Sequence, residues 1–265
     1  MMDSEATSPP AEIPLQKRPG RLRRLLSIPA KLGRLFREHG LREGIGMLVN
    51  FAKDRRGDRS FGVKTNRSYT LKEHGVDDEN YVDYSPITYA ALRATIRALP
   101  RELNNEDVFI DFGAGKGRVL LEAASRPLKR VIGIEFMPEL ADEAEKNIEI
   151  ARARGRLQCE TVDVSRQDAT EYAIPADATV LHFYNPFRGP VLDRVIENFA
   201  ESLREHPRPV IVLFANPDDF DRILKVGSPI PLEWVKSEEI VLWPFQRKND
   251  DELGNVYRNY LIDPS

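Results

Sequence analysis

The feature that most constrains this chain is a glycine-rich stretch that follows a short apolar run. Residues 108–112 are Val-Phe-Ile-Asp-Phe, and residues 111–117 read Asp-Phe-Gly-Ala-Gly-Lys-Gly. Glycine tolerates positive φ and has no Cβ, so Gly113, Gly115 and Gly117 permit a tight turn in which a ligand approaches the backbone closely. The pattern predicts a buried strand, a ligand-binding turn and a helix; the alternative for the turn is a purely structural loop.

Short apolar runs alternate with helical patterns on both sides of this turn. The runs are apolar on both faces, as expected of parallel strands that helices cover on each side. We expect a helix from Pro86 to Pro100, then strands at residues 108–112, 131–135, 160–164, 179–184 and 209–215, with helices at 118–125, 138–154 and 190–203. Residues 239–243 and 256–262 predict an antiparallel pair. The expected fold is α/β and Rossmann-like, a mostly parallel seven-stranded sheet with an antiparallel C-terminal hairpin and an N-terminal helical arm.

The position of the third glycine separates two kinds of nucleotide site. In dinucleotide dehydrogenases it comes three residues after the second glycine, and the following helix faces a pyrophosphate. Here Gly117 comes two residues after Gly115, which favours S-adenosylmethionine, a donor without phosphate. The second predicted strand ends at Glu135, whose carboxylate can accept hydrogen bonds from both ribose hydroxyls. We therefore predict S-adenosylmethionine as the cofactor.

Two further strand ends carry candidate functional residues. After the third strand, Asp168 can accept a hydrogen bond from the adenine amino group while the Ala169 backbone lies along the ring; the alternative for Asp168 is a helix N-cap. After the fourth strand comes Asn185-Pro186-Phe187, where the asparagine oxygen can accept a hydrogen bond from an attacking amine. The flanking aromatic residues, Tyr184 and Phe187, suit a sulfonium or an amine. The alternative for Asn185-Pro186 is a turn that only ends the strand.

Residues 81–190 resemble the catalytic core of the disruptor-of-telomeric-silencing type of lysine methyltransferases, and also a group of bacterial methyltransferase-domain proteins. Residues 109–119 are similar to the first motif of that family, and Glu135 matches its ribose-binding acid. Tyr84 and Thr88 match a tyrosine and a threonine that contact the donor there. The family has Asn-Asn-Phe where this chain has Pro186 in the middle position, which resembles the Asn-Pro-Pro-aromatic motif of enzymes acting on glutamine or adenine.

The residues and the resemblance together predict an enzyme, a class I S-adenosylmethionine-dependent methyltransferase that methylates an amine on a protein or another macromolecule. One alternative is a small-molecule or O-methyltransferase, and a second is a non-catalytic membrane- or nucleic-acid-binding module on the same fold. The predicted catalytic residues are Tyr84, Asn185, Pro186 and Phe187. The predicted donor contacts are Tyr84, Thr88, Asp111, Gly113, Ala114, Gly115, Gly117, Glu135, Phe136, Asp168, Ala169 and Asn185.

The N-terminal part of the chain differs in composition from the rest. Residues 1–20 are rich in proline and small polar residues, which predicts a disordered tail. Residues 21–58 predict a basic amphipathic helical arm broken near Gly40, and residues 17–58 hold twelve Lys/Arg against four Asp/Glu. Such an arm can contact an anionic membrane or nucleic acid, or it can dock on the body with its charges in solvent. We expect a linker or lid at residues 59–83 and the catalytic domain at 84–265.

Cysteine and histidine usage excludes two kinds of structural site. The single cysteine, Cys159, cannot form an intramolecular disulfide or a multi-cysteine zinc site, and the four histidines lack ligand spacing. We therefore expect no structural metal. The N-terminus lacks the apolar stretch of a signal peptide, and the apolar runs have strand length. A cytoplasmic protein, in contact with a membrane surface at most, fits these features.

Overall fold

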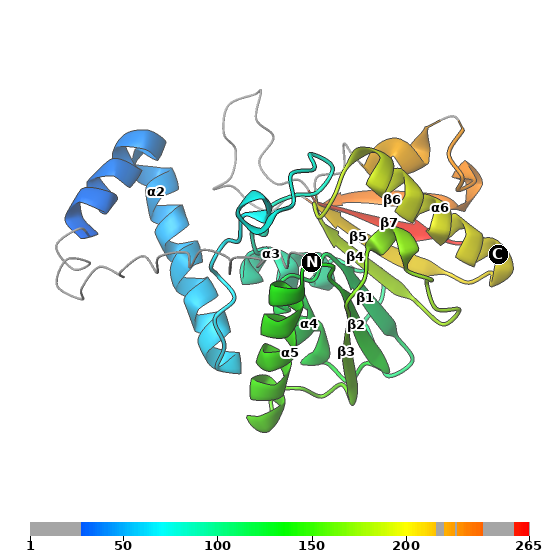
Figure 1. Ribbon diagram of the computed structural model, residues 1–265, viewed down its shortest axis with the longest axis horizontal. Helices are drawn as coiled ribbons and strands as arrows, with labels where there is room; N and C mark the ends of the chain where they lie inside the picture. The colour runs from blue at the N-terminus through cyan, green and yellow to red at the C-terminus, as the bar shows by residue number, and fades with distance from the viewer. Residues whose placement is uncertain (1–27, 216–219, 226, 241–256, 265) are drawn as a thin grey trace, which may run out of the picture. The chain divides into compact units, whose positions relative to one another are not determined.

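The computed structural model describes residues 28–215, 220–225, 227–240 and 257–264. Its contacts divide the chain into two units, Met1–Ile45 and Gly46–Ser265. Helices, strands and short 3-10 helices are coloured along the chain in Figure 1. In chain order they are α2 (Ile28–Phe61), η1 (Leu71–His74), α3 (Tyr89–Arg97), β1 (Val108–Phe112), α4 (Arg118–Ala124), β2 (Arg130–Ile134), α5 (Pro138–Ala153), β3 (Thr161–Ser165), η2 (Ala169–Glu171), β4 (Val180–Tyr184), α6 (Gly189–Glu205), β5 (Val210–Ala215), η3 (Asp221–Leu224), η4 (Leu232–Trp234), β6 (Val235–Ile240) and β7 (Tyr257–Ile262).

The second unit is built on a seven-stranded sheet in the order β3-β2-β1-β4-β5-β7-β6. The first five strands pair in parallel, and β7 pairs antiparallel with both β5 and β6. The order reverses beside β1, which lies between β2 and β4. In open α/β sheets, ligands bind beyond the carboxyl ends of the strands at such a reversal. The predicted α/β fold, with its antiparallel C-terminal pair, is confirmed.

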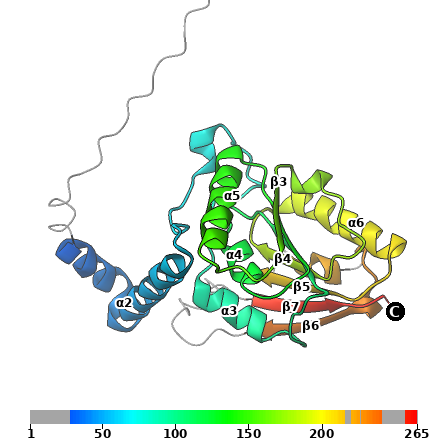
Figure 2. The ribbon, with the colours of Figure 1, turned by 90° about the horizontal axis from the view of Figure 1, so that it is seen from below.

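Helices cover both faces of this sheet, and alternate strand residues pack into two cores. Val108, Ile110 and Phe112 belong to the core that α6 covers, whereas Phe109 belongs to the core on the opposite face, with side chains from α3, α4 and α5. Figure 2 shows the sheet between these two layers. The central strands are buried on both sides, which explains why they are apolar at every position except Asp111 and His182.

Helix α2 extends across both units and is interrupted at Gly40, where φ is 75° and ψ is 167°. Glycine adopts this backbone without the steric cost of a Cβ, so the break lies where the sequence predicts it. The predicted tail, residues 1–20, lies outside the described residues. None of the helices in the described part of the chain is long and apolar enough to cross a membrane.

Element boundaries differ from the expected ones in two informative places. The helix expected from Pro86 begins at Tyr89, because the Thr88 side chain accepts a hydrogen bond from Ala91 N and caps it. The penultimate strand begins at Val235 rather than residue 239. Its Lys, Ser and Glu residues gave no apolar pattern, but an edge strand needs only the backbone hydrogen bonds that β7 supplies along its whole length. Residues 241–243 lie outside the described residues.

Candidate functional site

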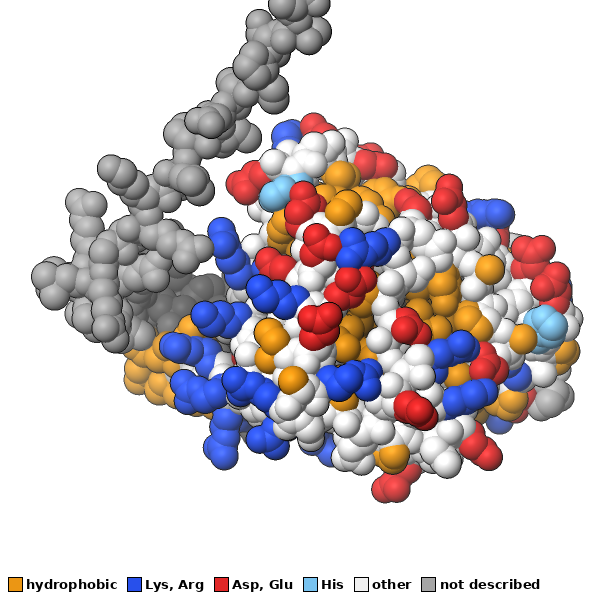
Figure 3. All heavy atoms as spheres, turned by 60° about the horizontal axis from the view of Figure 1, so that its bottom comes forward, with side chains coloured by type: hydrophobic (Ala, Val, Ile, Leu, Met, Phe, Trp, Pro, Cys, Tyr) orange, Lys and Arg blue, Asp and Glu red, His pale blue; other side chains and the backbone are white. Residues whose placement is uncertain are grey.

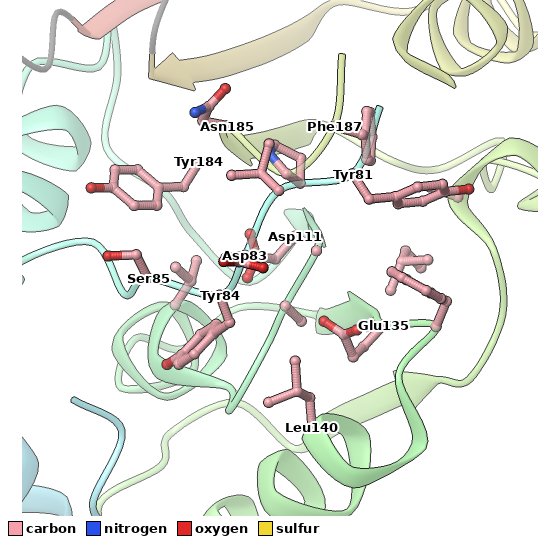
Figure 4. A pocket seen from close by; sticks show the side chains of 18 of the residues that line it. Tyr81, Asp83, Tyr84, Ser85, Asp111, Glu135, Leu140, Tyr184, Asn185 and Phe187 are labelled. Carbon is pink, nitrogen blue, oxygen red and sulfur yellow. The ribbon is translucent and has the colours of Figure 1, made fainter. Parts of the chain in front are cut away.

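A cavity that is partly open to solvent lies at the carboxyl ends of β1, β2 and β4. Its lining combines the glycine turn, the residues after β2 and β4, and a loop before α3. Figure 4 shows Glu135 at one end of the cavity, and Tyr184 and Asn185 at the other. The candidate residues that line it are Tyr84, Asp111, Gly113, Ala114, Glu135, Phe136, Ala169, Asn185, Pro186 and Phe187. Thr88, Gly115, Gly117 and Asp168 do not belong to the lining.

The glycine turn has the conformation that only glycine adopts readily. Gly113, Gly115 and Gly117 have φ values of 74°, 53° and 78°. A Cβ on Gly113 would lie 2.5 Å from the Pro186 Cβ, and one on Gly115 would lie 2.2 Å from the Tyr84 ring. Gly117 instead caps α4 and faces Ala144 of α5, where a Cβ would lie 3.2 Å from the Ala144 Cβ. Two glycines therefore shape the cavity, and the third allows two helices to pack.

Glu135 is buried directly after β2, and the protein backbone fixes both of its carboxylate oxygens. Gly115 N donates to Oε2 at 2.8 Å, and Met137 N donates to Oε1 at 2.9 Å. Burial is the main cause that raises the pKa of Glu135 to about 7, and the nearby Asp111 carboxylate contributes to this shift. The backbone hydrogen bonds oppose it. A carboxylate with remaining acceptor capacity in a buried site is suited to binding hydroxyl groups.

Donor affinity is expected to depend on the ionisation of Glu135. If the ionised form accepts hydrogen bonds from ribose hydroxyls, as the sequence predicts, S-adenosylhomocysteine should bind best above the Glu135 pKa of about 7 and about tenfold more weakly one pH unit below it. Calorimetry across this range should show the dependence in the wild type and not in Glu135→Gln, which cannot titrate. An identical pH profile in both proteins would assign the dependence to the ligand and not to Glu135.

Asp111 and His182 form a buried pair on adjacent strands. They lie opposite each other in the β1–β4 register, and His182 Nδ1 lies 2.7 Å from Asp111 Oδ1. Burial raises the pKa of Asp111, and His182 opposes this shift. The sequence favours a core role for His182, and its exposed fraction of 2% agrees with that. The pair fixes the Asp111 carboxyl beneath the glycine turn.

Asp168 is engaged mainly by its own segment. Thr170 N and Thr170 Oγ1 donate to Oδ1 at 2.8 Å and 2.6 Å. Asp168 therefore caps η2, which is the N-cap role that the sequence predicts as the alternative to adenine binding. The Tyr81 hydroxyl donates to Oδ2. Burial raises the pKa of Asp168, but these hydrogen bonds lower it more, so that it lies below its usual value. Ala169 and Phe136 line the cavity, and the Phe136 ring lies 4.8 Å from that of Tyr81.

Tyr84 is held over the glycine turn by a buried chain of hydrogen bonds. Its hydroxyl donates to Thr65 O at 2.8 Å. Thr65 N and Thr65 Oγ1 donate to the two carboxylate oxygens of Asp58, at 2.9 Å and 2.6 Å. Burial raises the pKa of Tyr84, so its hydroxyl stays protonated and donates to Thr65 O. We call this the Asp58–Thr65–Tyr84 chain.

Asn185 has two unusual features at the end of β4. Its φ is positive (47°), and among the described residues no other residue apart from glycines has a positive φ. Its Oδ1 is buried without a hydrogen-bond partner, although buried acceptors are nearly always paired. Pro186 packs against Gly113, and its carbonyl accepts a hydrogen bond from Val82 N at 3.2 Å. Phe187 lines the cavity but also belongs to the core, 3% exposed. Asn185 therefore belongs to the cavity lining and has a buried amide oxygen without a hydrogen-bond partner.

Tyr81, Asp83 and Arg118 belong to the cavity lining but were not predicted from the sequence as site residues. Tyr81 pairs with Phe187 through an isolated bridge, and Asp83 accepts a hydrogen bond from Leu71 N at 2.8 Å. Arg118 is 2% exposed and lies beneath the cavity. Tyr81 and Asp83 lie in a segment without periodicity. For Arg118, the only signal was a charged residue at the start of a helix with one other charge, Glu122.

Asp54, Asp58 and Tyr89 surround Arg118. Its Nη1 lies 3.4 Å from Asp54 Oδ2 and its Nη2 lies 3.7 Å from Asp58 Oδ1. Arg118 Nε donates to Thr65 Oγ1 at 2.7 Å, and Nη1 donates to Ile87 O at 2.7 Å. The guanidinium lies 4.8 Å from the centre of the Tyr89 ring. Helix α4, the end of α2 and the loop before α3 are thus joined by one buried cation.

Comparison with known proteins gives both family and fold relatives. A model of the family described as histone methylation protein DOT1 matches residues 75–207. A solved RNA methyltransferase from Salinibacter ruber, in complex with S-adenosyl-L-homocysteine, is 20% identical over 68% of this chain and 95% of that chain, with a TM-score of 0.44. A dimethyladenosine transferase from Plasmodium falciparum is 16% identical over 66% of this chain and 62% of that chain, with a TM-score of 0.47. Precorrin-6y C5,15-methyltransferase from Geobacter metallireducens is 17% identical over 71% of this chain and 96% of that chain, also with a TM-score of 0.47. The family match spans half of the chain and includes the glycine turn, Glu135 and Asn185.

Within the described residues, no group of three or more His, Cys, Asp or Glu side chains is arranged to hold a metal ion. Cys159 is buried in the core and is not part of the cavity lining.

Proposed function

Because the chain belongs to the histone methylation protein DOT1 family of S-adenosylmethionine-dependent methyltransferases, we propose that it transfers the donor methyl group to an amine nitrogen of a protein or another macromolecule. The observation that carries this proposal is the unpaired, buried Oδ1 of Asn185 at the cavity. An amine N–H supplies the donor that this oxygen lacks.

We propose that the cavity binds S-adenosylmethionine. Glu135, next to the glycine turn, offers a fixed and buried carboxyl that is suited to accept hydrogen bonds from ribose hydroxyls. Phe136 and Ala169 supply apolar lining for a base, near Tyr81. The donor contacts that we propose are the lining residues Tyr84, Asp111, Gly113, Ala114, Glu135, Phe136, Ala169 and Asn185. Of the other predicted contacts, Thr88, Gly117 and Asp168 cap helices, and Gly115 N donates to Glu135.

The charge of the lining favours a cationic or neutral amine over a phosphate-rich acceptor. Asp83, Asp111 and Glu135 are acidic, and Arg118 is the single base among the described lining residues. The guanidinium of Arg118 is already paired with Asp54 and Asp58. Aromatic side chains that attract cations, Tyr84 and Tyr184 among them, lie on the same side of the cavity in Figure 4. A lining of acidic and aromatic residues therefore suits an amine better than a phosphate-rich acceptor.

The proposed mechanism depends on alignment more than on acid–base chemistry. When bound, S-adenosylmethionine supplies a methyl group on a positively charged sulfur. A cationic acceptor first loses a proton to solvent. Asn185 Oδ1 then accepts a hydrogen bond from the neutral amine and so directs its lone pair at the methyl carbon; the carbon–nitrogen bond forms as the carbon–sulfur bond breaks, and S-adenosylhomocysteine leaves. Tyr84, held through its hydroxyl by Thr65 O, and Pro186, packed on Gly113, exclude water from the reacting pair. Such positioning contributes about 7–11 kcal/mol in favourable cases.

We propose that residues 59–83 form a lid over the donor. Leu71 packs with Met137 and Leu140. The bridge between Tyr81 and Phe187, and the 2.7 Å hydrogen bond from Arg188 N to Asn80 O, hold the other end of the segment on the loop after β4. These contacts support a lid over residues 71–83, whereas α2 continues through the proposed boundary at residue 59 and ends at Phe61, which is buried.

Labelled S-adenosylmethionine, incubated with the protein and fractionated cell extract, tests the acceptor class. We expect label in macromolecules, stable to mild alkali as N-methyl groups are. Label confined to hydroxyl groups of small molecules would replace the proposal with the small-molecule or O-methyltransferase alternative. Calorimetry that detects no donor binding would instead favour a non-catalytic module on this fold.

A further inference from the structure

The C-terminal half of α2, residues 46–61, separates its charges between two sides. Its acids face inward: Tyr89 N donates to Asp54 Oδ1 at 2.8 Å, and Asp58, 4% exposed, holds Thr65. Its bases are all exposed, namely Lys53, Arg55, Arg56 and Arg59. A solvated helix of mixed charge needs no such separation. The outward side is basic because the acids are used inside.

A second basic segment from another part of the chain adjoins this helix. Arg152, Arg154 and Arg156, at the end of α5 and just after it, are exposed. The Arg154 guanidinium lies so close to Gly62, which follows α2, that a Cβ there would come within 2.3 Å of it. Figure 3 shows Lys and Arg side chains concentrated on one side of the face that it presents. We define the basic surface as Lys53, Arg55, Arg56, Arg59, Arg152, Arg154 and Arg156.

Large apolar side chains are exposed on the same half of α2. Leu48, Val49 and Phe51 are 37%, 45% and 55% exposed. The Arg55 guanidinium lies 5.7 Å from the centre of the Phe51 ring, so the apolar and basic groups are direct neighbours. Single exposed apolar residues are ordinary, but three within four positions beside a cluster of bases mark an interaction surface.

We infer that this face of the protein binds an anionic membrane surface, with Leu48, Val49 and Phe51 in the interfacial layer and the basic surface on lipid phosphates. Basic residues beside exposed leucine and phenylalanine on one helix are the combination that interfacial binding requires. Nucleic acid would use the same charges, but Leu48 and Val49 gain nothing from a phosphate backbone. This binding is separate from methyl transfer, since none of these residues lines the donor cavity.

Co-sedimentation of the full-length protein with vesicles tests the inference. We expect binding to phosphatidylcholine vesicles that contain about 30% phosphatidylserine, little binding to phosphatidylcholine alone, and loss of binding in about 0.5 M salt. The variant R152Q/R154Q/R156Q should bind the anionic vesicles roughly 100-fold more weakly, at about fivefold for each arginine. The variant R97Q/K225Q/K236Q removes three exposed charges from other elements and should bind like the wild type. Phe51→Ser should weaken binding without changing its salt dependence.

Three outcomes would overturn the inference. The first is equal vesicle binding by the two triple variants, which would exclude the basic surface. The second is the absence of vesicle binding by the wild type. The third is preferential binding of a fluorescent RNA or DNA duplex, which would assign the surface to nucleic acid. Binding of S-adenosylhomocysteine, measured on every variant, shows that the proteins are folded and keeps this test separate from the proposed methyl transfer.

Discussion

Replacing Arg118 by methionine is expected to lower the free energy of unfolding by about 3–5 kcal/mol, because it leaves buried carboxylates without their cation. The side chains of Asp54 and Asp58 are only 13% and 6% exposed. Methionine is similar in length but supplies neither charge nor donors for Thr65 and Ile87 O. Chemical denaturation of the two proteins at neutral pH measures the difference.

The pH dependence and a matched variant identify the cause of this loss. Burial raises the pKa of Asp54 above its ordinary 3.8 even with Arg118 present, although Arg118 and a backbone hydrogen bond from Tyr89 oppose the shift. Without Arg118 the pKa rises further, so the cost is present above about pH 4 and diminishes as the pH falls toward that value. Arg166→Met removes another arginine with two carboxylate partners, Asp142 and Glu145, but at the surface, and should scarcely change the denaturation midpoint. Equal losses from both variants would mean that burial is irrelevant.

Removing the side-chain amide of Asn185 is expected to lower kcat of order 100-fold, since in the proposed mechanism the lost hydrogen bond forms with the acceptor amine. Donor affinity should fall much less, because the other seven proposed donor contacts remain. Two variants are needed because Asn185 has positive φ. Asn185→Ala removes the oxygen and adds backbone strain, whereas Asn185→Gly removes the oxygen and relieves it. Single-turnover rates with the identified acceptor, and calorimetry with S-adenosylhomocysteine, separate the two effects.

The comparison of the two variants decides between a chemical and a backbone role for Asn185. If the amide oxygen aligns the amine, both variants are slow. Activity in Asn185→Gly at the wild-type level would assign Asn185 to the turn alone, which is the alternative that the Asn-Pro sequence also allows. Asn185→Asp keeps an acceptor oxygen and should retain part of the rate.

The parts of this structure that the sequence predicts are those that depend on local pattern. β1, the glycine turn and the start of α4 lie in one continuous stretch, and Glu135 follows the next strand directly. The shared edge of a parallel sheet then brings them together. Tyr81 and Phe187, in contrast, are paired across more than a hundred residues, and nothing in the neighbourhood of either residue indicates the partner. The inward direction of Asp58 could not be predicted either. Residues 46–61 hold four bases and only two acids, a pattern that is also typical of a helix with its charges in solvent.

Helix α2 is connected indirectly to the donor cavity, because Asp58 on the inner side of the helix begins the Asp58–Thr65–Tyr84 chain. The outer side of the helix carries exposed basic and apolar groups. Any ligand that shifts this helix therefore alters the free energy of placing Tyr84 on the glycine turn. Thermodynamic linkage makes the effect reciprocal: whatever factor a bound surface applies to donor affinity, the donor applies to affinity for that surface. If a ligand on the outer side of α2 shifts this helix, donor binding and surface binding are therefore linked through the Asp58–Thr65–Tyr84 chain.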